Sequence, residues 1–321
     1  MTGMSQPNLR SDLNIRRADP GDRDALLAIA AQTWDGDDYL PHVLDAWFND
    51  PHGGFYVAEA RGEVLGVAKL TRLAEDEWWL EGLRVAPAYQ GQGISRILHH
   101  YVMNQVHQIG RGVVRFSTAS VDGAVPVLAR ETGFRHVATF LPYGADPLAE
   151  PVDGLRALGP DDAPRVRAWL DASPRFTAAQ RSVEADWTFT FLTPERLAVR
   201  LADGLVYGWA GAGPGALDGV VVLNPVGGER WFDGPTLKIG WFDAADGLLG
   251  QVARDVRRLA SALGRTAVRV KLFDDPDVVR ACEDAGYLRL WDGAVWLYAR
   301  PVHLAEHAVV RVDEAPDSPR S

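Results

Sequence analysis

The sequence predicts a mixed α and β protein in which one domain plan occurs twice. Gly110-Arg111 and Gly264-Arg265 each lead into an apolar run, and they lie 154 positions apart. Further along, Gly133 and Gly286 are each followed by an aromatic residue, at a spacing of 153. Matching segments that keep their order and nearly keep their spacing indicate a duplicated domain.

In the first half, alternating apolar residues and turn signals predict strands separated by amphipathic helices. Acidic residues open the first helix of each half, at Asp22 and at Asp162, directly after a short strand. Arg61-Gly62 is a turn that makes the second and third strands a hairpin. The strands are expected near 13–17, 54–60, 63–73, 77–85, 113–119 and 135–141, and the helices near 22–33, 40–49, 93–109 and 123–132.

Composition and charge narrow the possible functions. With 321 residues, the chain is long enough for two domains that each have their own core. Its composition, 47% hydrophobic and 24% charged, is that of a soluble globular protein. A net charge of −10 argues against nucleic acid as a partner and is compatible with a small cationic substrate. Cys282 is the only cysteine, which excludes an internal disulfide and favours the cytoplasm. No apolar run approaches the ~20 residues that span a bilayer, so we expect no membrane partner. The chain is expected to be a monomer or a homodimer.

A glycine-rich loop is the most informative segment of the chain. An apolar strand through Val85 is followed by a proline-bearing turn, by Gly91 and Gly93, and then by a helix. Glycines let backbone N–H groups approach a ligand closely, and a helix N-terminus adds unpaired donors, so this segment predicts a phosphate site. No Lys-Ser/Thr follows the glycines, which excludes a P-loop, and Arg96 stands where a dinucleotide loop needs a third glycine.

The run Gln90-Gly91-Gln92-Gly93-Ile94-Ser95 resembles the Gln/Arg-x-x-Gly-x-Gly/Ala loop of the GNAT superfamily of N-acetyltransferases, with Ser95 where the family prefers Gly or Ala. The resemblance implies an α/β (α+β) fold of two tandem GNAT-like domains, each a mixed, mostly antiparallel twisted sheet flanked by helices. It implies that acetyl-CoA is the cofactor. The backbone of the strand before the loop would then bind the pantetheine arm, and an N–H group near Val85 would donate to the thioester carbonyl. The positions carried over for coenzyme A are Leu83, Arg84, Val85, Gln90, Gly91, Gln92, Gly93, Ile94, Ser95 and Arg96.

The second half does not keep this loop. A shift of 154 places the segment 90–95 against 244–249, where Gly247 is the one glycine retained. Asp243 and Asp246 put carboxylates where pyrophosphate oxygens would lie, and like charges in contact repel. We therefore expect an intact first copy and a degenerate second copy that does not bind coenzyme A in the usual way.

These patterns divide the chain into five parts: a disordered N-terminus at 1–12, a catalytic GNAT domain at 13–145, a linker at 146–154, a degenerate GNAT-like domain at 155–304 and a C-terminal strand or tail at 305–321. The family expects one more strand than the first half supplies. We hypothesise that the apolar run at 307–312, or a neighbouring strand, closes a sheet edge between the halves. The alternative is a loose strand or a disordered tail.

Glu81 is the candidate general base. Residues on a strand alternate between faces, so Trp79, Glu81 and Leu83 are expected to share the face that family members use for a catalytic carboxylate. Beside Trp78 and Trp79, burial would raise the pKa of this carboxyl group toward neutrality. A glutamate whose head simply reaches solvent is an equal alternative, because acetyltransferases often remove the proton through a water chain.

No general acid is identified. Many relatives carry a tyrosine before the final Gly-Phe pair that protonates the departing thiolate, and Ala129 stands at that position here. Three explanations are open. Another group, such as Tyr89, Ser120 or Tyr143, replaces the missing tyrosine; the thiolate leaves without a general acid; or the protein binds its ligand without catalysis.

The loop between the first two helices is the candidate substrate site. It contains Trp34, Asp37, Asp38 and Tyr39, and aromatic rings beside carboxylates suit a cation or an amine. Helix capping by Asp37 or Asp38 explains these carboxylates equally well. The loop also resembles that of histidine N-acetyltransferase-type members, which supports an amino acid or small amine as substrate, with Trp79 as a further contact.

Together these features predict an acetyl-CoA-dependent N-acetyltransferase that acts on a small amine such as an amino acid, a polyamine or an aminoglycoside. A non-catalytic acyl-CoA sensor and a protein N-terminal or lysine acetyltransferase are the alternatives. His100 and His107 share a helix face without a Glu-x-x-His companion, so no metal site is predicted.

Overall fold

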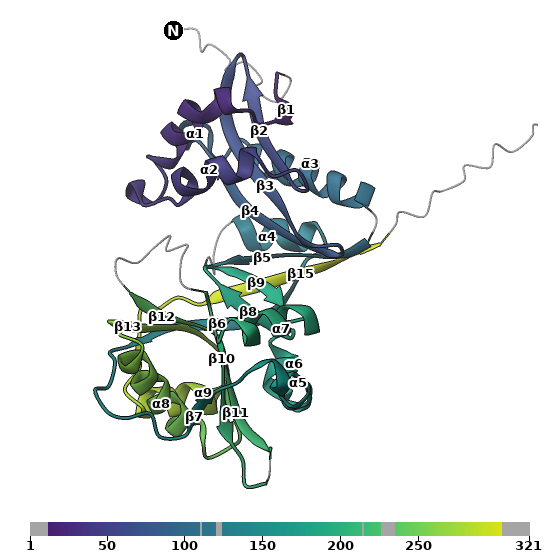
Figure 1. The fold of residues 1–321 in the computed structure, drawn as a ribbon. Coiled ribbons are helices and arrows are strands. Elements are labelled where there is room, and N and C mark those ends of the chain that lie inside the picture. The colour runs from purple at the N-terminus through teal and green to yellow at the C-terminus, as the bar shows by residue number, and fades with distance from the viewer. Residues whose placement is uncertain (1–11, 110, 120–123, 214, 226–234, 304–321) are drawn as a thin grey trace, which may run out of the picture.

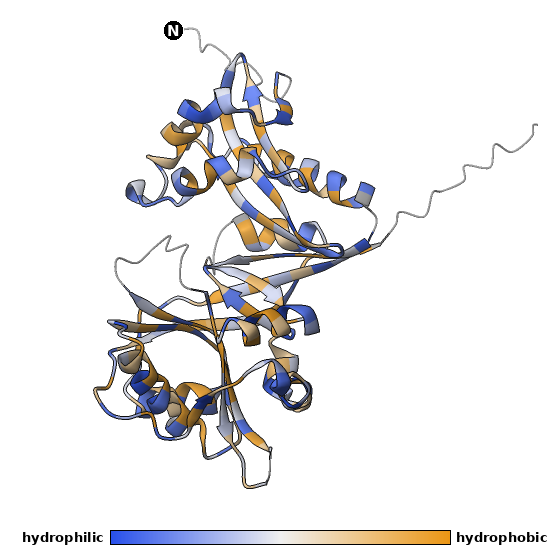
Figure 2. Cartoon of the chain, viewed as in Figure 1, coloured by the Kyte–Doolittle hydropathy of each residue, from blue (hydrophilic) through white to orange (hydrophobic). Residues whose placement is uncertain are grey.

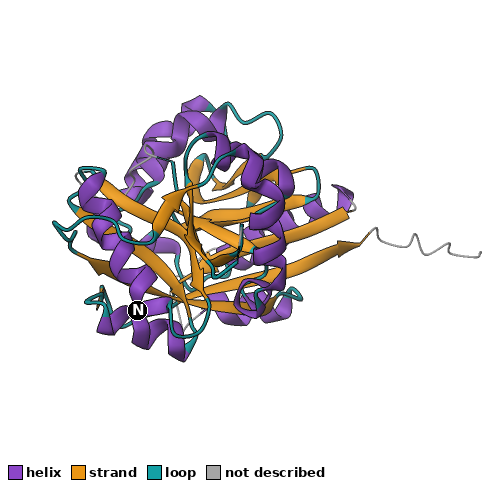
Figure 3. Cartoon of the chain, turned by 60° about the horizontal axis from the view of Figure 1, so that its bottom comes forward, coloured by secondary structure: helices purple, strands orange, loops and turns teal. Residues whose placement is uncertain are grey.

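The computed structural model describes residues 12–109, 111–119, 124–213, 215–225 and 235–303. Within these residues one sheet of 13 strands runs through both halves in the order β1-β2-β3-β4-β5-β15-β6-β13-β12-β11-β10-β7, with β14 beside β6 (Figure 1). Two parallel pairs, β4–β5 and β12–β13, interrupt an otherwise antiparallel sheet. Helices lie on both sides of the strands (Figure 3). The predicted fold class, a mostly antiparallel sheet flanked by helices, is confirmed.

The elements predicted for the first half are all present. The strands are β1 (Asn14–Arg17), β2 (Gly54–Ala60), β3 (Glu63–Ala74), β4 (Glu77–Val85), β5 (Arg111–Thr118) and β6 (Arg135–Ala145). The helices are α1 (Arg23–Ala30), α2 (Leu40–Phe48), α3 (Ile94–Ile109) and α4 (Ala124–Glu131). The largest difference is β6, which continues beyond its expected end at 141 because its last residues pair with β13.

The second half repeats this order of elements. Its sheet strands are β7 (Leu155–Ala157), β10 (Val206–Ala210), β11 (Leu217–Leu223), β12 (Thr236–Ala244), β13 (Ala267–Phe273), β14 (Leu288–Arg289) and β15 (Val295–His303). Its main helices are α5 (Ala163–Ala172), α7 (Pro194–Ala202), α8 (Leu249–Ala262) and α9 (Pro276–Asp284). Between α5 and α7 it carries α6 (Pro174–Ala178) and a hairpin of β8 (Ser182–Ala185) and β9 (Thr188–Phe191).

The two halves exchange strands at the centre of the sheet. β15, from the end of the chain, lies between β5 and β6 and is antiparallel to both. β6, from the first half, pairs in turn with β13 of the second half. The hypothesis that a strand near the C-terminus joins the halves is borne out by β15, whereas the run at 307–312 lies outside the described residues. Boundaries drawn along the chain therefore do not coincide with boundaries in the sheet.

Hydrophobic and hydrophilic residues alternate along the helices and strands (Figure 2). Buried side chains from the sheet and its helices form hydrophobic clusters. One hydrophobic cluster crosses the junction between the halves and includes Trp79 of β4, Leu297 of β15 and Phe189 of β9. Cys282 is buried in α9, and burial raises the pKa of its thiol to about 12. In the described part of the chain, no helix is long and apolar enough to cross a membrane.

A buried ion cluster also ties the halves together. The Glu77 carboxylate of β4 accepts hydrogen bonds from the guanidinium groups of Arg115 on β5 and Arg196 on α7. Arg115 also donates to Ser182 of the hairpin over 2.7 Å, and the Phe191 N–H donates to Glu77 over 2.9 Å. Burial lowers the pKa of Arg115 to about 10. Because Arg115 and Glu77 are both buried, removing the Glu77 carboxylate would leave the charge of the Arg115 guanidinium uncompensated.

The shared strand predicts a single cooperative unfolding transition. Leu297 of β15 is completely buried, so Leu297→Ala should lower the free energy of unfolding by about 2–5 kcal/mol. Leu288→Ala is the matched control, because Leu288 is 74% exposed, and it should change stability by less than about 0.5 kcal/mol. Urea titrations followed by far-UV circular dichroism and tryptophan fluorescence check this. Two separate transitions, with only one shifted by Leu297→Ala, would contradict it.

Candidate functional site

The parallel strands β4 and β5 form a gap that opens toward their carboxyl ends. They are paired at Glu77–Trp79 and Val113–Arg115, and no pairing between the described residues continues past these positions. The register that places Trp79 opposite Arg115 sets Glu81 and Ser117 on the two sides of the gap. A strand that loses its neighbour leaves peptide groups free to bind an extended ligand.

Two peptide groups of β4 face this gap. The N–H of Ala86 donates to the carbonyl of Leu65 on β3 over 2.9 Å, and alternation along the strand then turns Leu83 and Val85 away from β3. Their carbonyls accept instead from the side chains of Arg84 and Gln90, each over 3.1 Å. The backbone of Arg84 faces β3. Of the three strand positions predicted to bind the cofactor, Leu83 and Val85 therefore present their backbone to the gap.

A β-bulge at Gly82 reorients β4 beside the gap. The β3–β4 register shifts by one residue here, and Gly82 has a φ of +68°. A Cβ atom at Gly82 would lie 2.5 Å from the Trp47 ring, so a side chain does not fit. The extra residue changes which side chains share a face.

This bulge corrects one prediction. Leu83 packs into the hydrophobic cluster under α3, whereas Trp79 packs into the cluster on the opposite face. Simple alternation had placed both on one face with Glu81. The expected alternation fails because the bulge inserts one unpaired residue between Glu81 and Leu83.

The loop after β4 has the geometry of an anion cradle. Gly91 and Gly93 have φ values of +76° and +85°, and α3 begins one residue later at Ile94. No atom lies within 4 Å of a Cβ placed on Gly91, so its surroundings are open. The first N–H groups of a helix have no acceptor within the helix and favour a negative charge. Arg96 forms an ion pair with Glu131 of α4 at 2.9 Å.

Glu81 is held on the face opposite α3 by its neighbours on β3. Its carboxylate accepts a hydrogen bond from the Thr71 hydroxyl over 2.6 Å. Its register partner is Lys69, which is 1% exposed and pairs with Asp50. Burial lowers the pKa of Lys69, and the nearby Asp50 and Glu81 charges partly offset this effect. Glu81 is half-buried, and its role as a base stays a prediction.

The candidates for the general acid are not gathered at the gap. Ala129, at the position of the family tyrosine, is buried under α3. Tyr143 donates to Glu283 over 2.7 Å, and it lies in the core of the second half because β6 continues into that half. Tyr89 donates to Glu63 over 2.7 Å, and this hydrogen bond raises the pKa of its phenol. Ser120 lies outside the described residues.

The loop between α1 and α2 is organised around Arg84. Asp38 accepts from Nε of Arg84 over 3.0 Å and from its Nη2 over 3.3 Å, and its side chain is fully buried. The rings of Trp34 and Tyr39 have their centroids 4.2 Å and 5.3 Å from the centre of the Arg84 guanidinium. Asp38 also accepts from the N–H of Leu40 at the start of α2, over 3.1 Å.

Three of the predicted substrate residues thus surround an arginine of the chain itself. Asp37, beside them, is exposed. Trp79 is 3% exposed and lies 6.4 Å from Phe189 between ring centroids, so it is part of the core instead of an open pocket.

The hairpin of the second half, β8 and β9, reaches the gap and was not predicted from the sequence. The Ser117 hydroxyl of β5 donates to the Trp187 carbonyl at the hairpin turn over 2.6 Å. Asp186 and Trp187 have φ values of +45° and +73°, which are uncommon outside glycine. The Trp187 N–H donates to Glu184 over 2.7 Å and so helps to fix the turn. Its signal in the sequence is weak, because the segment 182–191 contains neither glycine nor proline to mark a turn.

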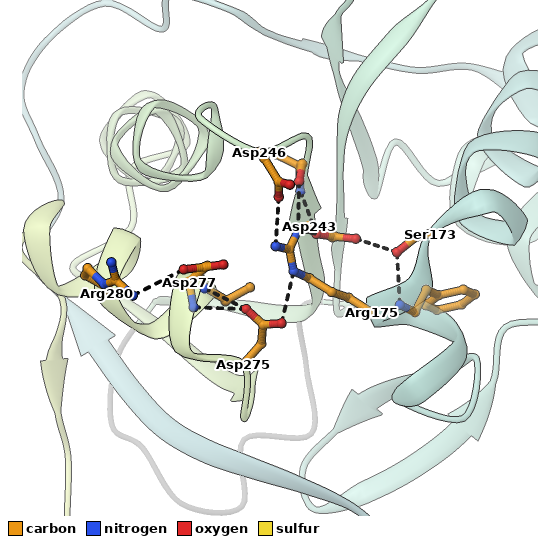
Figure 4. A network of polar contacts seen from close by, with 10 residues as sticks. Ser173, Arg175, Asp243, Asp246, Asp275, Asp277 and Arg280 are labelled. Atoms are coloured by element: carbon orange, nitrogen blue, oxygen red, sulfur yellow. Dashed lines mark hydrogen bonds and ion pairs between the residues drawn. The ribbon is translucent and has the colours of Figure 1, made fainter.

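At the equivalent place in the second half, a charged cluster occupies the end of β12 (Figure 4). Arg175 of α6 pairs with Asp243 at 3.3 Å, Asp246 at 2.9 Å and Asp275 at 3.3 Å. Asp243 also accepts from Ser173 over 2.6 Å, and burial raises the pKa of its carboxyl group. A cleft of about 470 Å³ beside the cluster is lined by Asp246, Gly247, Arg254, Asp277 and Arg280 among others.

The loops before the two equivalent helices also differ in length. Residues 245–248 join β12 to α8, whereas residues 86–93 join β4 to α3. Gly247 and Gly93 share a φ of +85°, which supports their equivalence. The carboxylates predicted at this position are present, and an arginine that the repeat did not reveal neutralises them.

Comparisons with known proteins agree over the first half. The model of the Acetyltransferase (GNAT) family matches residues 24–134. Histidine N-acetyltransferase of Oreochromis niloticus is 29% identical over 103 residues, 30% of this chain and 31% of that protein. N-alpha-acetyltransferase RimI of Mycobacterium tuberculosis is 31% identical over 114 residues, 34% of this chain and 70% of that protein. The chain thus spans about a third of the length of the histidine acetyltransferase.

A solved structure matches both halves together. A GCN5-related N-acetyltransferase from Sphaerobacter thermophilus aligns with a TM-score of 0.62 at 16% identity, over 91% of this chain and 96% of that one. At this identity the likeness concerns the fold alone. It shows that the fold of the whole described chain, with its two halves, occurs in another protein.

Replacing Asp38 should destabilise the fold, whereas replacing its neighbour Asp37 should not. Asp38→Ala would leave Arg84 without its carboxylate partner and should lower the free energy of unfolding by about 3 kcal/mol. Asp37→Ala, the matched control on an exposed residue, should change it by less than about 0.5 kcal/mol. Thermal and urea unfolding of the two variants measure the difference. Equal stability of both variants would show that the Arg84–Asp38 pair does not support the fold.

Proposed function

The chain belongs to the acetyltransferase (GNAT) family, and from this premise we propose that it is an acetyl-CoA-dependent N-acetyltransferase of small amines. The reaction is assigned to the gap between β4 and β5. One observation supports this assignment above the others. The peptide groups of Leu83 and Val85 that face the gap are followed along the chain by the two left-handed glycines and then by the N-terminus of α3. An extended amide-containing arm that ends in a pyrophosphate fits this sequence of donors and acceptors.

The chain's own groups can be given roles in acetyl transfer. Bound acetyl-CoA would supply an activated thioester. The Val85 N–H faces the gap and is the donor assigned to the thioester carbonyl, where negative charge develops during attack. Glu81, positioned by Thr71, is assigned to remove the proton of the amine, directly or through water.

The second half is assigned a role in shaping the acceptor site. Its hairpin packs on β5, and the Trp187 carbonyl lies on Ser117 at the edge of the gap. The Arg175 cluster argues against a second coenzyme A in this half, because carboxylates take the place of the cradle. We therefore expect one coenzyme A per chain.

Release of free thiol from acetyl-CoA tests the proposed activity. Amino acids, polyamines, aminoglycosides and a short peptide with a free N-terminus form the panel of acceptors. Thiol that appears only in the presence of an amine supports the enzyme. The specific competitor is a non-catalytic acyl-CoA sensor, which the buried Ala129 at the tyrosine position favours. Binding of acetyl-CoA without thiol release for any acceptor would identify the sensor.

A charge placed in the cradle tests where coenzyme A binds. Gln92→Asp gives the first half the carboxylate that the second half carries at Asp246, and repulsion should raise the Kd for coenzyme A at least about tenfold. Gln92→Asn, which has the same size as Asp without the charge, should stay within about threefold. Isothermal titration calorimetry measures both the Kd and the stoichiometry. Equal affinities for the two variants would exclude this loop as the pyrophosphate site.

Removal of the Glu81 carboxylate tests the assigned base. Glu81→Gln should lower kcat by about 100-fold at neutral pH and leave the KM for acetyl-CoA unchanged. The dependence of kcat on pH should also flatten, because the titrating group is gone. Glu195→Gln, on the exposed start of α7, is the control and should retain the wild-type rate. A Glu81→Gln enzyme with a normal pH–rate profile would remove Glu81 from the mechanism.

A further inference from the structure

We propose that Arg84 binds a carboxylate of the acceptor, so that the substrate is an amine that also carries a carboxylate, as a free amino acid does. This inference rests on the proposed acetyltransferase function and narrows its substrate class. From the sequence, the acidic and aromatic residues of the α1–α2 loop indicated a cation or an amine as the ligand. In the folded chain the buried carboxylate of that loop is neutralised by Arg84, and the guanidinium is the group presented beside the gap.

The Arg84 guanidinium lies at the edge of the gap. The residues on either side of it, Leu83 and Val85, present their peptide groups to the gap, and Nη1 of Arg84 donates to the Leu83 carbonyl over 3.1 Å. That contact brings the charged end of the side chain to the edge along which the thioester is expected. A ligand group in the gap would therefore meet guanidinium N–H donors next to the reacting centre.

The guanidinium retains donors for a second carboxylate. Asp38 accepts one hydrogen bond from Nε and one from Nη2 of Arg84, and the Leu83 carbonyl accepts one from Nη1. Arginine has five N–H donors, so within the described contacts one N–H remains on each Nη atom. Two N–H groups on neighbouring nitrogens match the spacing of the two oxygens of a carboxylate.

The surroundings of Arg84 hold it in one orientation. Trp34 and Tyr39 both place their rings against the guanidinium, and its side chain is 12% exposed. Trp34, Asp35 and Gly36 form a left-handed turn with φ values of +50°, +58° and +90°. This region is unfavourable for the two residues that are not glycine, Trp34 and Asp35. The contacts of Trp34 with Arg84 help to offset this cost, and the result is a pre-positioned cation.

Arg84 and Glu81 lie on the same side of β4. The side chains of Leu83 and Val85 pack toward α3, whereas Arg84 reaches the α1–α2 loop and Glu81 lies across from Lys69 on that same side. The two residues are three positions apart, which is within ~10 Å along a strand. An amino acid can therefore place its amine near Glu81 while its carboxylate binds Arg84.

Matched pairs of acceptors test the proposal on the wild-type protein. Thiol release is measured with histidine against histamine and with leucine against isoamylamine, each pair differing only in the carboxylate. We expect kcat/KM to be at least tenfold higher for the amino acid of at least one pair. Equal values within both pairs, or preference for the decarboxylated amines, would overturn the role of Arg84 and leave the acetyltransferase function standing. No thiol release with any amine would overturn both.

Variants of Arg84 locate the preference. Arg84→Gln should raise the KM of the amino acid at least tenfold and leave the KM of its decarboxylated partner unchanged, and Arg84→Lys should recover part of the loss. Arg61→Gln, in the exposed turn between β2 and β3, is the control. An Arg84→Gln enzyme that weakens both members of a pair equally would indicate a structural role alone. The wild-type comparison decides the proposal if Arg84→Gln does not fold.

Discussion

Backbone hydrogen bonding along β15 is the constraint on which the rest of the structure depends. This strand has β5 on one side and β6 on the other, so its peptide groups are shared between the halves. β6 completes the exchange by pairing with β13. Neither half can close its sheet without a strand from the other, because a missing central strand would leave two unpaired edges.

The same junction sets the shape of the gap at β4 and β5. At one end of this strand pair, Glu77 binds Arg115 and Arg196 in a buried cluster that also involves the hairpin. At the other end the strands have separated, and the Gly82 bulge brings Arg84 to the same side of β4 as Glu81, where Arg84 contacts the α1–α2 loop. Because the buried ion cluster holds one end of β4 and β5 together, the other end can stay separated when no ligand is bound.

The two halves contain loops with related backbones and different electrostatics. Gly93 and Gly247 adopt the same φ immediately before equivalent helices. In the first half the neighbouring side chain is neutral Gln92, and in the second it is Asp246, which pairs with Arg175. A helix N-terminus with a carboxylate already beside it has little attraction left for phosphate. The halves therefore differ in chemistry more than in fold.

The sequence by itself determined the elements of the first half, the duplication and the glycine loop, because all three depend on local periodicity, spacing and glycine conformation. The tertiary structure alone decided which strands meet, since β15 and β6 exchange through contacts between distant segments. It also decided that Tyr143 lies far from the gap, that Leu83 and Glu81 occupy opposite faces, and that Asp38 is paired with Arg84. Side-chain charge is readable from sequence, but whether that charge is free or neutralised depends on the residues that the fold brings beside it.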